Sequence, residues 1–149
     1  MKKIQFNLTA PNLLCICVDE RLHGENSGRV YSCYFREAVS FLQEYQLIKI
    51  TEQLMDSIDH PQASVKSRRF RGKEEKPTRK PEKVMEGWEV AEQRGKLATF
   101  LVHNQYRQKA TWQGELLWLE EERKFLFRSE LELLKWMDHA MEKREILEN

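Results

Sequence analysis

The stretch ATWQGELLWLEEERKFLFRSELELLKWMDHAM, residues 110–141, decides the fold that we expect for this chain. Residues 115–120 and 124–127 are short runs of mainly apolar residues, which predicts two strands. After Ser129 the apolar spacing becomes that of an amphipathic helix, and Ser129 followed by Glu132 predicts a capping box at its start. We therefore expect two strands and then a helix to about residue 143, which buries Leu133, Leu134, Met137, Ala140 and Met141.

The same plan occurs in the first third of the chain, displaced by 86 positions without a gap. Apolar positions coincide as well as identities, so strand faces and helix faces stay in register. A period of two that changes to 3.6 at the same place in both copies indicates a common fold. We interpret the match as an internal duplication. The identical pairs are Arg21 and Arg107, Gly28 and Gly114, Phe41 and Phe127, Glu44 and Glu130, Leu47 and Leu133, Lys49 and Lys135, and Met55 and Met141.

In the first copy we expect a strand at residues 13–20, apolar on both faces over part of its length, as is typical of the middle of a sheet. A hairpin loop at residues 24–28 and a return strand at residues 29–34 follow. A third strand at residues 38–41 leads into a helix at residues 43–58, which His60 and Pro61 end because proline disfavours a helical residue before it. A short strand at residues 4–8 precedes these elements.

The second copy begins after Gly95, with a strand at residues 98–107 and a loop at residues 110–114 in place of the first copy's loop. Between the copies, residues 61–83 show no periodicity. Residues 84–93 fit either a short edge strand or a docking turn, and Gly87 argues against a helix there.

We predict an α+β fold of two tandem β-β-β-α repeats, with antiparallel sheet or sheets covered by one helix each. The first repeat is residues 1–60, a basic proline-containing linker is residues 61–94, and the second repeat is residues 95–149. A repeat of this size struggles to fold alone, so we expect the two to share one core. We expect them to pack through the strand faces that are apolar on both sides, and the exposed remainder of those faces also suits a homodimer.

Charge distribution and cysteine content limit the classes of function that the chain can have. The segment 66–83 carries nine basic residues against three acidic ones, a net charge of +6, so the rest carries −5 in a chain of net charge +1. This segregation bears on partners rather than on the fold. No stretch approaches the length of a transmembrane span or a signal peptide, so we expect a cytoplasmic protein without membrane contact. Three cysteines, an odd number, then fit reduced thiols better than a disulfide framework.

Neither a metal site nor an active site is indicated. Cys15 and Cys17 form one close pair, with His103 at the position equivalent to Cys17, whereas zinc needs four ligands that usually arrive as two close pairs. Buried cysteines commonly act as small apolar side chains, so we favour a structural role for them. No nucleophile elbow, phosphate loop or zinc helix is present, and we predict neither enzymatic activity nor a cofactor.

The hairpin at residues 106–114 is the stronger candidate for recognition. Tyrosine, tryptophan, arginine and glutamine combine flat apolar area with hydrogen-bonding groups, which is the composition of binding hot spots. Arg21 and Arg107, related by the repeat, could face each other and grip a small anion, or each could pair with a nearby carboxylate. Trp112 could equally fold back over the sheet edge. The candidate binding residues are Arg21, Tyr106, Arg107, Gln108, Trp112 and Gln113.

The basic segment offers an alternative function. Its cations could neutralise nucleic-acid phosphates, although linkers of this composition often only keep a chain solvated. The residues concerned are Arg68, Arg69, Arg71, Lys73, Arg79 and Lys80. We therefore predict a non-catalytic binding or accessory protein that recognises a protein partner or a small anionic ligand through residues 106–114. The alternative is a nucleic-acid-binding protein that uses residues 66–83.

One block of the sequence resembles a known group of proteins. Tyr106-Arg107-Gln108, Ala110-Thr111-Trp112-Gln113-Gly114 and Phe127-Arg128-Ser129-Glu130-Leu131-Glu132-Leu133 are similar to a block in small uncharacterised bacterial proteins. The resemblance covers about the last third of the chain, with weaker echoes at Pro61-Gln62 and Arg69-Phe70. It implies a family with the strand, hairpin and helix described above, and it implies no activity.

Overall fold

A computed structural model describes residues 5–61, 81–108 and 111–148, and shows an α+β fold. Six strands form one antiparallel sheet in the order β3-β2-β1-β4-β5-β6. The elements are β1 (Leu14–Leu22), β2 (Glu25–Ser32), β3 (Val39–Phe41), α1 (Glu44–Ile58), α2 (Gly87–Val90), β4 (Ala98–Gln108), β5 (Thr111–Trp118), β6 (Arg123–Phe127) and α3 (Glu130–Glu148).

The two halves of the chain meet edge to edge at the centre of the sheet. β1 pairs with β4 in antiparallel register, from Leu14 opposite Val102 to Val18 opposite Ala98. The prediction that residues 13–20 lie in the middle of a sheet is confirmed. The prediction that the halves pack through strand faces is wrong, because backbone hydrogen bonds between β1 and β4 join them into a single sheet. The faces that remain apolar are covered by helices and loops instead.

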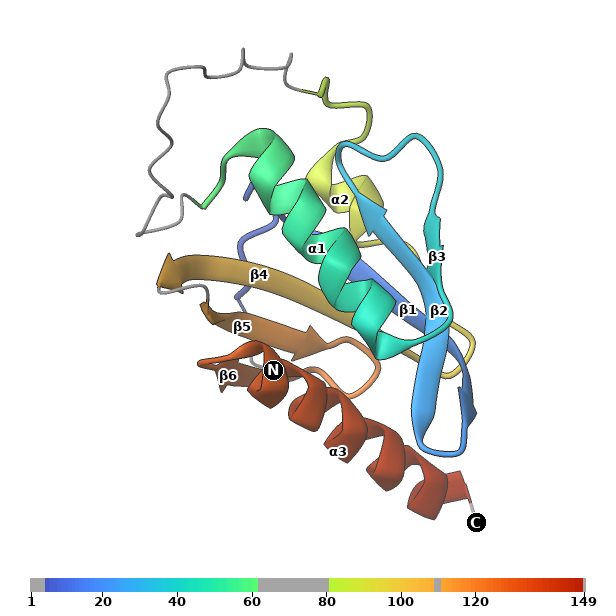
Figure 1. Cartoon of the computed structure of the whole chain (residues 1–149). Helices are drawn as coiled ribbons and strands as arrows, with labels where there is room; N and C mark the ends of the chain where they lie inside the picture. The colour runs from blue at the N-terminus through green and yellow to red at the C-terminus, as the bar shows by residue number, and fades with distance from the viewer. Residues whose placement is uncertain (1–4, 62–80, 109–110, 149) are drawn as a thin grey trace.

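Both long helices lie on one face of this sheet, as Figure 1 shows. α1 contacts β2 and β3, and α3 contacts β5 and β6. Side chains from both halves form one continuous core beneath them, with Ile16 and Phe100 at its centre strands and Leu54 and Met137 on its helices. A single shared core follows because each half alone presents an apolar face too small to stand in water. Leu134, which we expected to be buried, is only partly buried.

The opposite face carries a smaller apolar cluster, covered by the N-terminal segment and α2. Cys15, Cys17 and Leu101 lie in it together with Val90 of α2. The argument that Gly87 excludes a helix is wrong, because α2 begins at this residue. A side chain there would meet the Leu8 carbonyl oxygen at 1.8 Å, so glycine permits the close approach. Residues 5–8 are not a strand, and residue 4 lies outside the described residues.

Both hairpins are tighter than the sequence suggested. In the first, β1 ends at Leu22 and β2 begins at Glu25, so the expected loop at residues 24–28 belongs mostly to β2. In the second, residues 111–114 are the start of β5 rather than a loop, and residues 109–110 lie outside the described residues. The two strand pairs carry bulges at Val18/Glu20 and Asn104/Tyr106, which are equivalent positions in the two halves. A bulge lets the strands twist and continue to the hairpin end, and simple alternation does not reveal it.

The ends of the long helices show why they begin and stop where they do. Ser129 Oγ accepts a hydrogen bond from the Glu132 amide at 3.1 Å, and Glu132 accepts one from the Arg128 amide at 2.7 Å, so the predicted capping box is present with one residue's shift. α3 continues to Glu148, beyond the predicted end near residue 143. α1 ends at Ile58, and its C-cap residue Asp59 takes the left-handed conformation immediately before His60 and Pro61. None of the described helices is long and apolar enough to cross a membrane.

Candidate functional site

The β4–β5 hairpin, in residues 106–114, divides into a buried side and an outward side. Arg107 is 6% exposed, and its side chain reaches from the end of β4 to the end of α1. Its Nη1 lies 2.8 Å from Asp56 Oδ1 and 3.9 Å from Glu52 Oε1, and its Nε donates to the Pro61 carbonyl oxygen at 2.8 Å. The guanidinium therefore has carboxylate and carbonyl partners within the chain. Of the two alternatives for Arg107, the carboxylate pair is the one observed.

Trp112 lies beside Arg107 on the buried side of the hairpin. The two residues are opposite each other in the β4–β5 register, and Trp112 is fully buried. Its indole Nε1 donates to Glu52 Oε2 at 2.6 Å, so the ring is fixed to α1 as well as to the sheet. The expectation that Trp112 contributes to an exposed recognition surface is wrong, and the alternative that it folds back onto the protein is correct. Its role is to hold the hairpin in place.

Tyr106 and Gln113 form the outward side. They pair across the hairpin just after the bulge, and Tyr106 is 59% exposed. Gln113 is half-buried. Gln108 is the last residue of β4, opposite Thr111, and its side chain lies outside the described part of the structure. Among the predicted hairpin residues whose side chains the structure describes, Tyr106 and Gln113 are thus the two that face outward.

Arg21 lies at the other end of the sheet from Arg107. Because β1 and β4 are antiparallel, β1 runs on past Val18 in one direction and β4 runs on past Val102 in the other. The expectation that the two arginines face each other around an anion is therefore wrong. Arg21 Nη1 lies 3.1 Å from Asp138 Oδ1 of α3, and it also donates to Asn26 Oδ1 at 3.0 Å.

Each arginine contacts the helix of the other half of the chain. Arg21 of the first half contacts Asp138 of α3, and Arg107 of the second half lies 3.9 Å from Glu52 of α1. A displacement of 86 positions carries Arg21 to Arg107 and Glu52 to Asp138. The two ion pairs thus join equivalent positions with the halves exchanged. The sequence match contained both pairs, but only the fold shows that they are partners.

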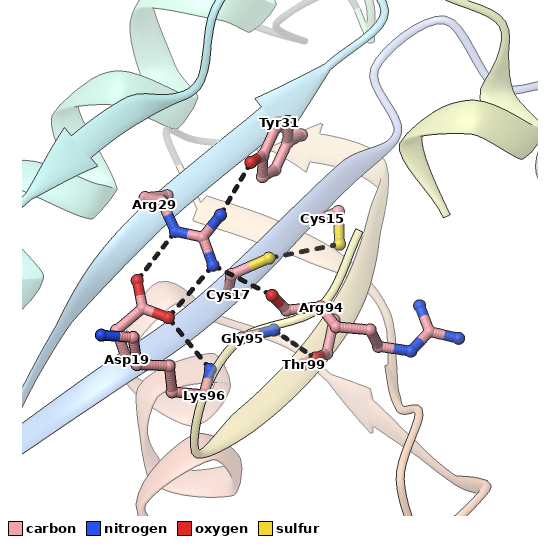
Figure 2. A network of polar contacts seen from close by, with 9 residues as sticks. All are labelled: Cys15, Cys17, Asp19, Arg29, Tyr31, Arg94, Gly95, Lys96 and Thr99. Atoms are coloured by element: carbon pink, nitrogen blue, oxygen red, sulfur yellow. Dashed lines mark hydrogen bonds and ion pairs between the residues drawn. The ribbon is translucent and has the colours of Figure 1, made fainter. Parts of the chain in front are cut away.

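A polar network lies on the opposite face of the sheet, around the middle of β1 and β2, where Cys17 pairs with Arg29 (Figure 2). Arg29 Nε and Nη2 donate to the two carboxylate oxygens of Asp19 at 2.8 and 3.1 Å, and Nη2 also donates to the Arg94 carbonyl oxygen at 2.9 Å. The Asp19 carboxylate accepts a further hydrogen bond from the Lys96 amide at 3.0 Å. The neighbouring guanidinium lowers the pKa of Asp19, and the carboxylate raises the pKa of Arg29. This bidentate pair fixes the turn before β4 to the sheet.

Two thiols lie next to this ion pair. Cys15 and Cys17 are fully buried on the same strand face, and their sulfur atoms are 3.9 Å apart (Figure 2). The hydrogen bond from Cys15 and the charge of Arg29 lower the pKa of Cys17, although burial opposes them. The same hydrogen bond and burial raise the pKa of Cys15. All three cysteines are free thiols, and Cys33 is a separate member of the same apolar cluster.

No metal centre is assembled from the described residues. Within residues 5–61, 81–108 and 111–148, no three histidine, cysteine, aspartate or glutamate side chains form a group that could hold a metal ion. His103, which we compared with Cys17, is half-buried, and burial lowers its pKa. Its Nδ1 atom has no hydrogen-bond partner among the described residues.

A cavity that the sequence did not indicate lies beside α2. Its volume is about 280 Å³, and it opens between the N-terminal segment, the end of β2 and α2. Val84 and Met85 hold the chain there by donating their amides to the Cys33 carbonyl oxygen at 2.8 and 3.1 Å. We call this space the α2 cavity. It is lined by Leu8, Thr9, Ala10, Pro11, Cys33, Tyr34, Lys83, Glu86, Gly87 and Trp88. Trp88, which is 56% exposed, is the most prominent apolar side chain at this place.

The residues of the nucleic-acid hypothesis lie outside the described part of the structure. These are Arg68, Arg69, Arg71, Lys73, Arg79 and Lys80. Comparison with known protein families, with curated proteins and with solved structures finds no match to this chain.

Proposed function

We propose that this protein is a non-catalytic binding or accessory protein that recognises a protein partner through the outward side of the β4–β5 hairpin. The observation that carries the proposal is the division of this hairpin into two sides. Arg107 and Trp112 bind one side to α1, whereas Tyr106 is 59% exposed on the other. The tyrosine is therefore presented to solvent on a segment that the rest of the molecule holds in place.

A fixed, exposed tyrosine suits protein recognition. Tyrosine offers a large flat surface and a hydroxyl group while losing little side-chain entropy on binding. A segment that is already ordered loses less entropy again when a partner binds. Gln113 opposite Tyr106 adds an amide that both donates and accepts hydrogen bonds. Together they make a small patch of the kind that anchors an interface.

A protein partner fits this surface better than a small anion. Both arginines that we considered for anion binding already contact carboxylates, Arg21 with Asp138 and Arg107 with Asp56. A bound anion would have to displace these carboxylates, and for Arg107 it would also have to reach a guanidinium that is 94% buried. Tyr106 and Gln113, which the described part of the hairpin presents on its outward side, carry no charge.

Affinity capture with matched variants tests the proposal. Tyr106→Ala and Gln113→Ala should lose a partner that the wild-type protein retains, because they remove the patch without touching Arg107 or Trp112. Tyr45→Ala is the control, since Tyr45 is a similarly exposed tyrosine (67%) at the start of α1. The partner is identified by mass spectrometry, and a second copy of this chain is one of the identities it can have. Equal capture by all three variants would rule the hairpin out.

We also infer that the two halves are copies of one β-β-β-α unit, as the sequence match suggests. Three features support this inference: the strand order is symmetric about the β1–β4 pair, the two bulges occupy equivalent positions, and so do the two exchanged ion pairs. An experimental structure would test it. One rotation should superpose residues 14–58 on residues 100–144, bulges included, and strands that superpose only with a shifted register would refute the inference.

We propose further that the protein works in the cytoplasm. The three free, buried thiols support this location, because oxidising compartments favour disulfides. Alkylation of the denatured protein, isolated from cells under acid quench, should label three thiols per chain. A fraction with fewer reactive thiols before reduction would count against the location.

A further inference from the structure

The α2 cavity combines an apolar interior with a charged mouth. Its walls include Leu8, Ala10 and Pro11 of the N-terminal segment and the rings of Tyr34 and Trp88. Two charged residues, Lys83 and Glu86, line the same space. Ligand sites are typically apolar with a few converging polar groups, so the composition is that of a binding site rather than of a packing defect.

The two charges at the mouth are adjacent and opposite. Lys83 Nζ lies 3.0 Å from Glu86 Oε1, and the two side chains are 51% and 61% exposed. An ion pair this open to water contributes little to stability, so breaking it costs little. A ligand that carries an anion and a cation side by side can replace the one ion pair with two, one to each residue.

We propose that the α2 cavity binds a free amino acid with an apolar side chain. In this arrangement the side chain occupies the apolar interior, the α-carboxylate pairs with Lys83, and the α-ammonium pairs with Glu86. Few other small molecules place the two charges on one carbon atom beside an apolar group. An interior residue of a peptide carries neither charge, and a fatty acid or an amine carries only one.

The volume of the α2 cavity agrees with this assignment, and so does a comparison with a second hollow that has no charged residue in its lining. A volume of about 280 Å³ lies just below the range of roughly 300 to 1,000 Å³ for drug-sized ligands, so the ligand is small. A second hollow of about 280 Å³, beside α1, is lined by Phe35, Val39, Ile50, Gln53, Leu54 and Ser57. No charged residue lines it, so it provides a comparison site within the same protein.

Nuclear magnetic resonance titration of the isotope-labelled full chain tests the proposal. The ligands are L-phenylalanine, L-leucine, and three phenylalanine analogues that each lack a charge: 3-phenylpropanoate, phenethylamine and N-acetyl-L-phenylalaninamide. The amide signals of Thr9, Gly87 and Trp88 and the indole signal of Trp88 report binding. We expect both amino acids to shift these signals, and phenylalanine to bind about three- to fivefold more tightly than each analogue, because each analogue loses at least one solvent-exposed ion pair.

Variants assign each charge to its residue. Lys83→Gln should remove the preference of phenylalanine over phenethylamine, and Glu86→Gln should remove its preference over 3-phenylpropanoate. Both residues are exposed, and glutamine keeps the side-chain oxygen with which Glu86 caps α2, so neither change endangers folding. Lys124→Gln is the control, because Lys124 forms a lysine–glutamate pair with Glu115 at 3.5 Å outside the cavity, and it should bind like the wild type. Ala10→Leu, which fills the cavity, should abolish all shifts.

Three results would overturn the proposal. Affinities for phenylalanine and its three analogues within about twofold of one another would mean an apolar hollow without charge recognition. Shifts confined to residues around Phe35 and Ser57 would place the ligand in the second hollow. No shift with any ligand would mean that the cavity is not a binding site. None of these results bears on the function proposed for the β4–β5 hairpin, because no hairpin residue lines the cavity.

Discussion

Arg107 at the end of β4 and Asp56 at the end of α1 lie 2.8 Å apart, Nη1 to Oδ1, although 51 positions separate them in the chain. The pair closes one end of the molecule, because it ties the tip of the β4–β5 hairpin to the last turn of α1. Arg21 and Asp138 do the same at the other end, between β1 and α3, at 3.1 Å. The hairpin tips are thus fixed by the helices and not only by their own turns.

Replacing Arg107 should destabilise the protein. Arg107→Met removes a buried guanidinium and leaves the Pro61 carbonyl oxygen without its donor, so we expect a loss of about 2 to 3 kcal/mol in the free energy of unfolding. We expect a smaller loss than is usual for a broken buried ion pair, because Asp56 is 67% exposed and regains water. Urea denaturation followed by circular dichroism measures the change. Asp56→Asn keeps a hydrogen-bond acceptor but leaves the buried guanidinium with Glu52, at 3.9 Å, as its remaining carboxylate, so it should cost about 1 to 2 kcal/mol. A larger loss than for Arg107→Met would contradict the weight that we give to the Pro61 contact.

Trp112 should depend on its indole nitrogen as well as on its ring. Trp112→Phe keeps most of the buried apolar area but removes the hydrogen bond to Glu52, so the expected cost is about 1 to 2 kcal/mol. Trp136→Phe is the control, because Trp136 donates to the Leu126 carbonyl oxygen at 2.9 Å from a position that is only partly buried. Its cost should stay under about 1 kcal/mol. Thermal unfolding that ranks the two variants in the opposite order would show that the Glu52 contact contributes nothing.

The glycines of the two bulged strand pairs should be intolerant of a side chain. A Cβ atom on Gly28 would lie 1.9 Å from the Cys17 carbonyl oxygen, and one on Gly114 would lie 2.1 Å from the His103 carbonyl oxygen. Both obstacles are backbone atoms, so strands must move apart, and we expect Gly28→Ala and Gly114→Ala each to cost about 2 to 4 kcal/mol.

Gly24 provides the contrast among the glycines. Its φ is +78° and nothing lies within 4 Å of a Cβ atom built there, so the demand is conformational rather than steric. Asparagine tolerates this conformation, and Gly24→Asn should cost less than about 1 kcal/mol. Stabilities of the three variants, measured side by side in urea, check both predictions. A tolerated Gly28→Ala beside a severe Gly24→Asn would mean that the hairpin is not built as described.

His103 should make the protein less stable in mild acid. Burial lowers the pKa of this side chain from its ordinary value of 6.5, so the unfolded chain binds a proton more readily than the folded one as the pH falls through that value. Stability therefore rises with pH across this window and is lost below it. Urea midpoints between pH 5 and 8 should show a steeper dependence for the wild type than for His103→Gln. Identical slopes would mean that His103 titrates as an exposed residue.

The sequence predicted those parts of the fold that local pattern controls. Alternation and helical spacing located β1, α1 and α3, and Ser129 with Glu132 located the start of the last helix. The displacement of 86 positions also anticipated that the two halves carry the same elements. It did not predict how they meet, because an apolar strand face looks the same whether it covers another sheet or lies under a helix. The halves are joined by backbone hydrogen bonds between β1 and β4, and the types of side chain in a strand do not show which strand it pairs with.

The sequence did not predict where the side chains of the candidate hairpin would lie. Arg107 and Trp112 have the composition of a binding surface, but arginine and tryptophan are equally suited to buried contacts when carboxylates are within reach. The partners Glu52 and Asp56 stand four positions apart on one helix, and only tertiary structure brings them to the hairpin. The α2 cavity was missed because it is formed by three segments that are distant in sequence, each of which lacks a motif.

The central claim is that the outward side of the β4–β5 hairpin contacts a protein partner, and site-specific photo-cross-linking tests it most directly. A photoreactive phenylalanine analogue at position 106 is irradiated in cells, with the same analogue at position 45 as the control, since both replace exposed tyrosines. We predict a discrete cross-linked product from position 106 that is absent from position 45 and that Gln113→Ala weakens. No product at position 106, or the same products at both positions, would contradict the claim.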